Sequence, residues 1–128
     1  MSSETITRAN LAAILNEVLP PSGVEEWTPS ITTTSGKLNT VFGYKYGSVY
    51  QLRLNVQNSS ATANGSNIYT GTLSNHIPIL QMTGVGFYGG IAFSIAISDT
   101  GIITVRNIGT ASLSANNAVT VCITYIAL

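Results

Sequence analysis

The hydrophobic period of this sequence changes at one point, and that change constrains the fold more than any other feature. Before Pro20 and Pro21, apolar residues recur at helical spacing; after Ser22 and Gly23, they alternate with polar residues through most of the chain. A period of two places neighbouring side chains on opposite faces of a β-strand. The sequence therefore predicts a helical segment, residues 1–21, followed by a β domain, residues 22–128.

The helix is predicted over residues 7–19. Its apolar side chains Leu11, Ile14, Leu15 and Val18 fall on one face of a helix. A helix of this length is only marginally stable alone in water. We therefore expect the stripe to pack against the β domain or against the same helix of neighbouring chains, which makes these four residues the predicted oligomerisation contacts.

The β domain contains several segments of strong alternation and others that are weaker. The predicted strands share β-branched and aromatic residues closed by turn signals: residues 27–34, residues 40–46, Val49–Gln57, Ile91–Ile97, Ile102–Asn107 and Ala118–Ile126. The polar segment 58–67 is predicted to be an exposed loop, and the glycines of Gly84-x-Gly86 and Gly89-Gly90 are interpreted as turn residues. Seven or eight short strands without a second helix predict an antiparallel β-sandwich of the jelly-roll type.

The chain carries very little charge. Charged residues make up 8% of its 128 residues, and five basic residues balance five acidic ones. We expect no nucleic-acid binding, because the basic surface that phosphates attract is missing. A neutral chain also lacks the repulsion that keeps copies apart, which favours a homo-oligomer. Its apolar runs are too short to span a membrane, and no signal peptide is evident, so synthesis in a cytoplasm is expected.

Few residues could carry chemistry. The chain has one histidine, His76, one cysteine, Cys122, and five scattered acidic residues, so no catalytic set, metal site or cofactor is predicted. Cys122 is expected to be a small core residue. An alternative function is a retroviral-type aspartic protease built on Asp99-Thr100-Gly101, because two such chains could pair their aspartates around one proton. A hairpin turn explains the same three residues.

Recognition of carbohydrate requires exposed aromatic faces beside uncharged polar groups on loops. Tyr69, Asn75, His76 and Tyr88 are predicted to lie in or beside turns between the middle strands, which makes them the candidate ligand-binding residues. Trp27 and Tyr44 could equally fill the core.

The segment ITRANLAAILNEVLPP and the C-terminal NAVTVCITYIAL resemble tail-fibre and baseplate-type proteins of phages and prophages from Gram-positive bacteria. The resemblance implies a virion protein in which a short helix precedes a jelly-roll-like head. It also implies that three chains assemble and that the head contacts a host-surface glycan or other virion proteins. A decoration protein without any ligand is a further alternative.

Overall fold

The computed structural model describes residues 23–128. The predicted helix, with its stripe of Leu11, Ile14, Leu15 and Val18, lies outside the described residues, as does the proposed boundary at residues 21 and 22.

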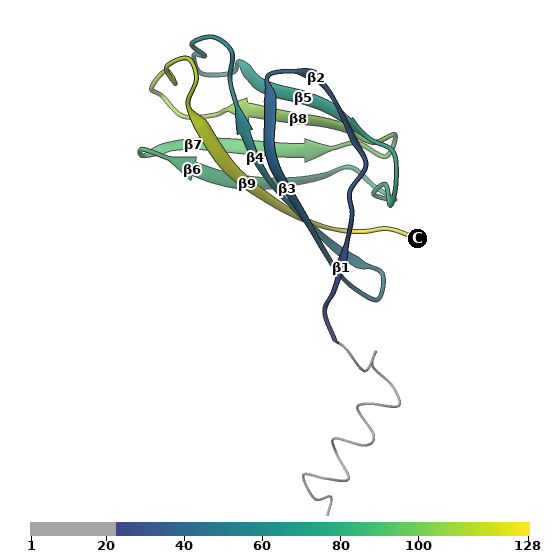
Figure 1. The fold of residues 1–128 in the computed structure, drawn as a ribbon. Helices are drawn as coiled ribbons and strands as arrows, with labels where there is room; N and C mark the ends of the chain where they lie inside the picture. The colour runs from purple at the N-terminus through teal and green to yellow at the C-terminus, as the bar shows by residue number, and fades with distance from the viewer. Residues whose placement is uncertain (1–22) are drawn as a thin grey trace, which may run out of the picture.

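Residues 23–128 form one curled antiparallel sheet of nine strands, in the order β1-β3-β4-β9-β6-β7-β8-β5-β2 (Figure 1). The strands are β1 (Glu25–Trp27), β2 (Ile31–Ser35), β3 (Lys37–Tyr46), β4 (Val49–Gln57), β5 (Asn67–Leu73), β6 (Met82–Tyr88), β7 (Ile91–Ile97), β8 (Ile102–Asn107) and β9 (Ala118–Ile126). The all-β prediction is confirmed, since this part of the chain contains no helix. Accordingly, no helix capable of crossing a membrane occurs among residues 23–128.

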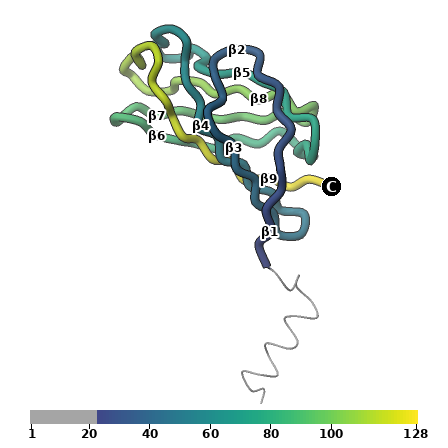
Figure 2. The backbone as a smooth tube through the Cα atoms, in the orientation of Figure 1, coloured from purple at the N-terminus to yellow at the C-terminus, as the bar shows by residue number. Residues whose placement is uncertain are grey.

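The sheet turns a sharp corner between β9 and β6. In Figures 1 and 2, β3, β4 and β9 run diagonally across β5 to β8, and β6 meets β9 in only two register pairs, Val85 with Cys122 and Gly86 with Val121. A side chain at Gly84 would collide with the carbonyl oxygen of Cys122, so glycine permits this close crossing. The interpretation of Gly84 and Gly86 as turn residues was therefore wrong: both lie within β6.

A second corner, at Gly36, joins the two ends of the sheet. β2 pairs with β5 at one end and β3 pairs with β4 at the other, yet one residue separates β2 from β3. Gly36 has a φ of +78°, and a Cβ there would lie 2.6 Å from the carbonyl oxygen of Ile68 and 3.0 Å from that of Gln57. Only glycine meets both the backbone angle and the space at this corner.

The core fills the space inside the curled sheet. β4 and β9 pair in register over their whole lengths, and their alternating apolar side chains face inward. The fully buried side chains include Leu52, Leu54 and Val56 of β4 with Val121 and Ile123 of β9. Burial of each such side chain contributes roughly 1.5–3 kcal/mol, so the alternation seen in the sequence is the main source of stability.

The strand predicted over residues 27–34 is divided in the structure. β1 ends at Trp27 and β2 begins at Ile31, with Pro29 between them. The side chain of Asn75 replaces strand pairing here: its Oδ1 accepts from the N–H of Ser30 at 2.8 Å, and its Nδ2 donates to the carbonyl of Thr28 at 2.9 Å. The break follows from proline, which has no N–H to give to a ladder.

Two buried asparagines hold the loops 58–66 and 108–117 together at one end of the sheet. Asn107 Nδ2 donates to the carbonyls of Thr62 at 3.1 Å and Ala111 at 3.0 Å, while its Oδ1 accepts from the N–H of Gly109 at 2.9 Å. Asn58 makes comparable bonds to Ser60, Ser114 and Asn117. The prediction of an exposed loop was therefore only partly right, because Asn58 and Thr62 are buried.

Aromatic rings close the opposite end. Tyr50 stacks on His76 with centroids 4.7 Å apart and on Tyr125 with centroids 5.9 Å apart, while Trp27 meets Tyr50 edge to face at 5.4 Å. Burial, together with the nearby Tyr50, raises the pKa of Tyr125 well above its ordinary value. The Tyr125 hydroxyl is buried without a hydrogen-bond partner among the described residues.

We expect Asn107→Ala to lower the free energy of unfolding by about 2–3 kcal/mol, because it removes the three hydrogen bonds through which the buried side chain holds the loops. Urea unfolding measures this change. Asn39→Ala is the matched control: its side chain is exposed and bonds to Asn55, so a change within about 0.5 kcal/mol is expected. Equal losses in the two variants would show that the loop contacts are not specially stabilising.

Tyr125→Phe should leave stability at neutral pH unchanged or raise it, because the lost hydroxyl has no partner. Folding raises the pKa of Tyr125, so ionising its hydroxyl costs more free energy in the folded state than in the unfolded state. The stability linked to the neutral hydroxyl is fully present below the unfolded pKa of 10.0 and is lost as pH rises through the folded pKa. The variant should therefore lose less stability than wild type above pH 10, measured by urea unfolding across a pH series. If the unfolding free energy of the variant fell as steeply with pH as that of wild type, the raised pKa of Tyr125 would be contradicted. Tyr88→Phe, at an exposed tyrosine, is the control.

Candidate functional site

The outer surface carries a group of exposed aliphatic side chains near the point where the described chain begins. We call this group the apolar strip; its members are 40% (Met82) to 70% (Leu80) exposed, and they are Val24, Val49, Ile79, Leu80, Met82 and Ile126. Isolated exposed apolar residues are ordinary on protein surfaces, whereas a contiguous group marks a contact surface.

Sheet register brings the strip together from segments far apart in the sequence. Val49 of β4 lies opposite Ile126 of β9, and the N–H of Ile79 donates to the carbonyl of Ile126 at 3.1 Å. A depression of about 330 Å³ lies among Val49, Leu80, Met82 and their neighbours. A smaller one of about 210 Å³ shares Val49 with it and extends to Val24. The strip is thus continuous from Val24, just before β1, to Met82, the first residue of β6.

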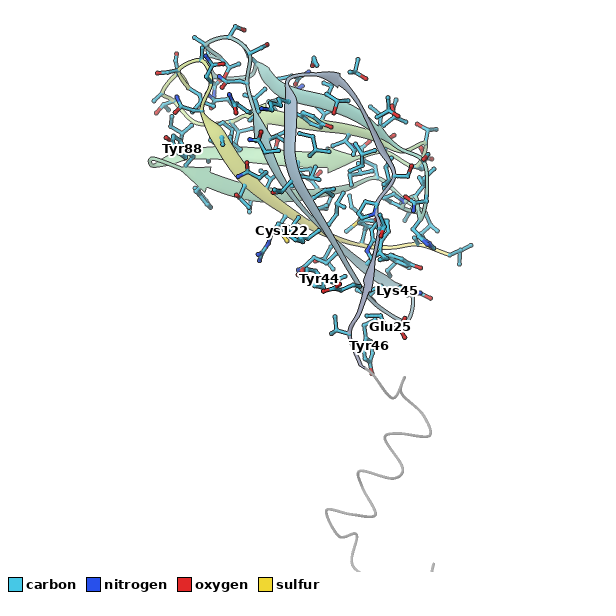
Figure 3. The ribbon with its side chains drawn as sticks, viewed as in Figure 1. Glu25, Tyr44, Lys45, Tyr46, Tyr88 and Cys122 are labelled. Atoms are coloured by element: carbon cyan, nitrogen blue, oxygen red, sulfur yellow. The ribbon has the colours of Figure 1, made fainter. Side chains whose placement is uncertain are left out.

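Charge is confined to one end of this surface. The larger depression has no charged side chain in its lining, and Lys45 borders only the smaller one. Lys45 forms an ion pair with Glu25 at 3.8 Å, and both side chains are partly exposed. Figure 3 shows these two residues beside Tyr44 and Tyr46, where β1 meets the β3–β4 hairpin. An exposed pair of this kind contributes at most about 1 kcal/mol to stability.

Tyr69 is not on a turn, contrary to the prediction. It lies within β5, is fully buried, and its hydroxyl is 2.9 Å from the Thr33 Oγ1. Burial raises the pKa of Tyr69, and the hydrogen bond to Thr33 partly opposes that rise. A register shift between Asn67 and Tyr69 turns both Ile68 and Tyr69 inward, which breaks the alternation that would have identified the strand. Tyr69 therefore has no surface with which to contact a ligand in this structure.

Asn75 and His76 are both held by the fold. Asn75 bonds to the backbone of residues 28 and 30, as described above, and His76 is half-buried against Tyr50 and Trp27. His76 has a φ of +48°, in the left-handed region that is uncommon for residues other than glycine. The structure therefore brings these two predicted ligand residues close to each other, but as supports of the loop between β5 and β6.

Tyr88 is the predicted ligand residue that presents a broad surface. It lies at the end of β6, is 43% exposed, and its hydroxyl donates to Asn117 Oδ1 at 3.2 Å. In Figure 3 it stands far from Tyr44 and Tyr46, at the opposite end of the molecule. The four candidate residues thus do not form one site.

The remaining candidates lie apart from one another. Asp99 is exposed in the turn between β7 and β8, where the Ser98 hydroxyl accepts from the N–H of Ile102 at 3.0 Å. An aspartic protease would require two such carboxylates to face each other in a sheltered place.

Cys122 was expected in the core, but it lies half-buried on the outward face of β9, because register sets it opposite Arg53 and Val85. Within residues 23–128, no three metal-ligating side chains come together.

Sequence comparison finds no protein family whose model matches this chain, and no curated protein that matches it significantly.

Proposed function

We propose that this chain is a self-assembling structural module, a tail-fibre or baseplate-type head of a phage virion, and that copies of it associate through the apolar strip. The observation that carries the proposal is the continuity of exposed aliphatic side chains from Val24 to Leu80. The finer architecture that goes with this function is a jelly-roll-like sandwich, for which the curled antiparallel sheet is the support.

A second copy of the chain is the occupant that fits this surface best. The larger depression is lined without charge, so a partner needs no complementary ions, and a chain of zero net charge does not repel its own copies. Closed cyclic symmetry allows the same strip on each copy to be buried.

The strip includes Val24, which is the second residue that the structure describes. We propose that the helix predicted over residues 7–19 contributes its apolar stripe to the same assembly. We propose a homotrimer on the resemblance to tail-fibre proteins, with the strip and the stripe as its contacts.

Leu80→Asp should dissociate the assembly, because a carboxylate in an apolar interface loses several kcal/mol of hydration. Leu80 is 70% exposed, so the fold itself should tolerate the change. Light scattering coupled to size exclusion at micromolar concentration measures the mass, which should be three times that of one chain for wild type and lower for the variant. Ile102→Asp, at a similarly exposed position on β8, is the control and should remain assembled. A light-scattering mass equal to that of one wild-type chain would contradict the proposal.

The proposed head also contacts a host-surface glycan, and Tyr88 is the predicted ligand residue best exposed to do so. Tyr88→Ala should weaken binding to isolated host cell wall about tenfold, as removal of a stacking aromatic does. Tyr88→Phe keeps the ring and should retain most of the binding. A wild-type chain that assembles but binds no glycan would instead support the alternative of a decoration protein without ligand.

A further inference from the structure

The sequence contains one Asn-Gly pair, Asn64-Gly65, in the loop between β4 and β5. Both residues are exposed, and a Cβ at Gly65 would meet no atom within 4 Å. Because glycine has no side chain, its backbone nitrogen can approach the side-chain carbon of the preceding asparagine when the chain is free to move. This pair is therefore the place where a side-chain amide of the chain is chemically most vulnerable.

The reaction of such a pair is deamidation, and it requires only water and a solvent base. The nitrogen of Gly65 gives up its proton to the base and bonds to the Cγ of Asn64. The bond from Cγ to the amide nitrogen breaks, and ammonia leaves. Water then opens the cyclic imide at either carbonyl, which yields aspartate or isoaspartate. Water replaces ammonia overall, and nothing is oxidised or reduced.

The native turn holds Gly65 away from this reaction. The N–H of Ser66 donates to the carbonyl of Ala63 at 3.1 Å, Gly65 has a φ of +82°, and the φ of Asn64 is negative. This combination is a type II turn, in which the ψ of the first central residue is about +120°. At that ψ the Gly65 nitrogen is rotated away from the Cβ of Asn64, so the imide ring cannot close until the turn opens.

Hydrogen bonds to the end of β8 hold both reacting groups as well. The N–H of Gly65 donates to the carbonyl of Asn107 at 2.7 Å, and Asn64 Nδ2 donates to the carbonyl of Gly109 at 2.7 Å. The first bond retains the proton that Gly65 must lose, and the second fixes the amide that must rotate. Both acceptors lie in the segment that the Asn107 side chain holds through its three bonds to the loops.

We propose that Asn64 is a site of spontaneous deamidation that reacts only when the loops 58–66 and 108–117 separate, and whose product then keeps them apart. The new carboxylate has no hydrogen to donate to the carbonyl of Gly109, so two acceptors face each other. Isoaspartate also adds the Cβ of residue 64 to the main chain, which displaces the N–H of Gly65 from Asn107. A chain that has reacted therefore opens more easily at this end. This inference does not depend on the assembly proposed above.

Incubation of the full chain at mildly alkaline pH tests the proposal. Peptide mass spectrometry measures the loss of the Asn64 amide, and isoaspartyl methyltransferase labels the isoaspartate. The folded chain should react at least about tenfold more slowly than the same chain unfolded in urea, because the loops must open first. Equal rates in the two states, or no reaction at Asn64 in the unfolded chain, would overturn the proposal.

Asn107→Ala should raise the deamidation rate of the folded chain about tenfold, because it releases both acceptors. Leu52→Ala is the matched control: it lies in the core on β4, away from both loops, and costs at least as much stability. Its deamidation rate should stay close to that of wild type while the chain remains folded. Equal acceleration in the two variants would show release through global unfolding and would overturn the role of the loops.

Asn64→Asp reproduces the carboxylate of the product without the reaction. Hydrogen exchange at the amide of Gly65 should be about tenfold faster in this variant than in wild type. Exchange at Leu73, whose N–H donates to Gly101 at 2.7 Å at the other end of β5, should be unchanged. If exchange at Gly65 were also unchanged, the product would not keep the loops apart, and that part of the proposal would be wrong.

Discussion

Closure of the curled sheet at Gly36 is the constraint on which the rest of the structure depends. The chain passes from β2 to β3 through this one residue, so the two outer regions of the sheet are held together by covalent bonds as well as by packing. The inward side chains of β4 and β9 can then face those of β5, β7 and β8 across one core. A side chain at position 36 would push the Ile68 backbone away and separate these walls.

The two open ends of the sheet are sealed by different chemistry. At one end, amide side chains of Asn58 and Asn107 take the place of backbone partners in irregular loops, which cannot satisfy one another through a regular ladder. At the other end, rings from β1, β4, β9 and the loop after β5 stack into a cap. The same cap fixes Trp27, whose indole Nε1 also donates to the carbonyl of Tyr44 at 3.1 Å.

The strands whose alternation is regular were predicted from the sequence, whereas β5 and β6, whose alternation is interrupted, were not. Val49–Gln57, Ile91–Ile97, Ile102–Asn107 and Ala118–Ile126 have the predicted bounds. In β6 the pattern was hidden because Gly84 and Gly86 occupy positions where β9 crosses closely, and in β5 a register shift hid Tyr69. The apolar strip was not predicted, because Val49, Ile79 and Ile126 come together only through the pairing of β4 with β9 and the backbone hydrogen bond from Ile79 to Ile126.

The pairing of β4 with β9 also determines the order in which the domain can fold. Each of its register pairs joins residues more than 60 positions apart in sequence, for example Gln57 with Ala118. Loop closure of that length must precede most of the stabilising burial, so topology of this kind is typical of slow-folding domains. β4, the third of the nine strands in sheet order, therefore pairs with the strand that is synthesised last in the described domain. Until β9 arrives, one long edge of β4 remains open to the strands of other chains.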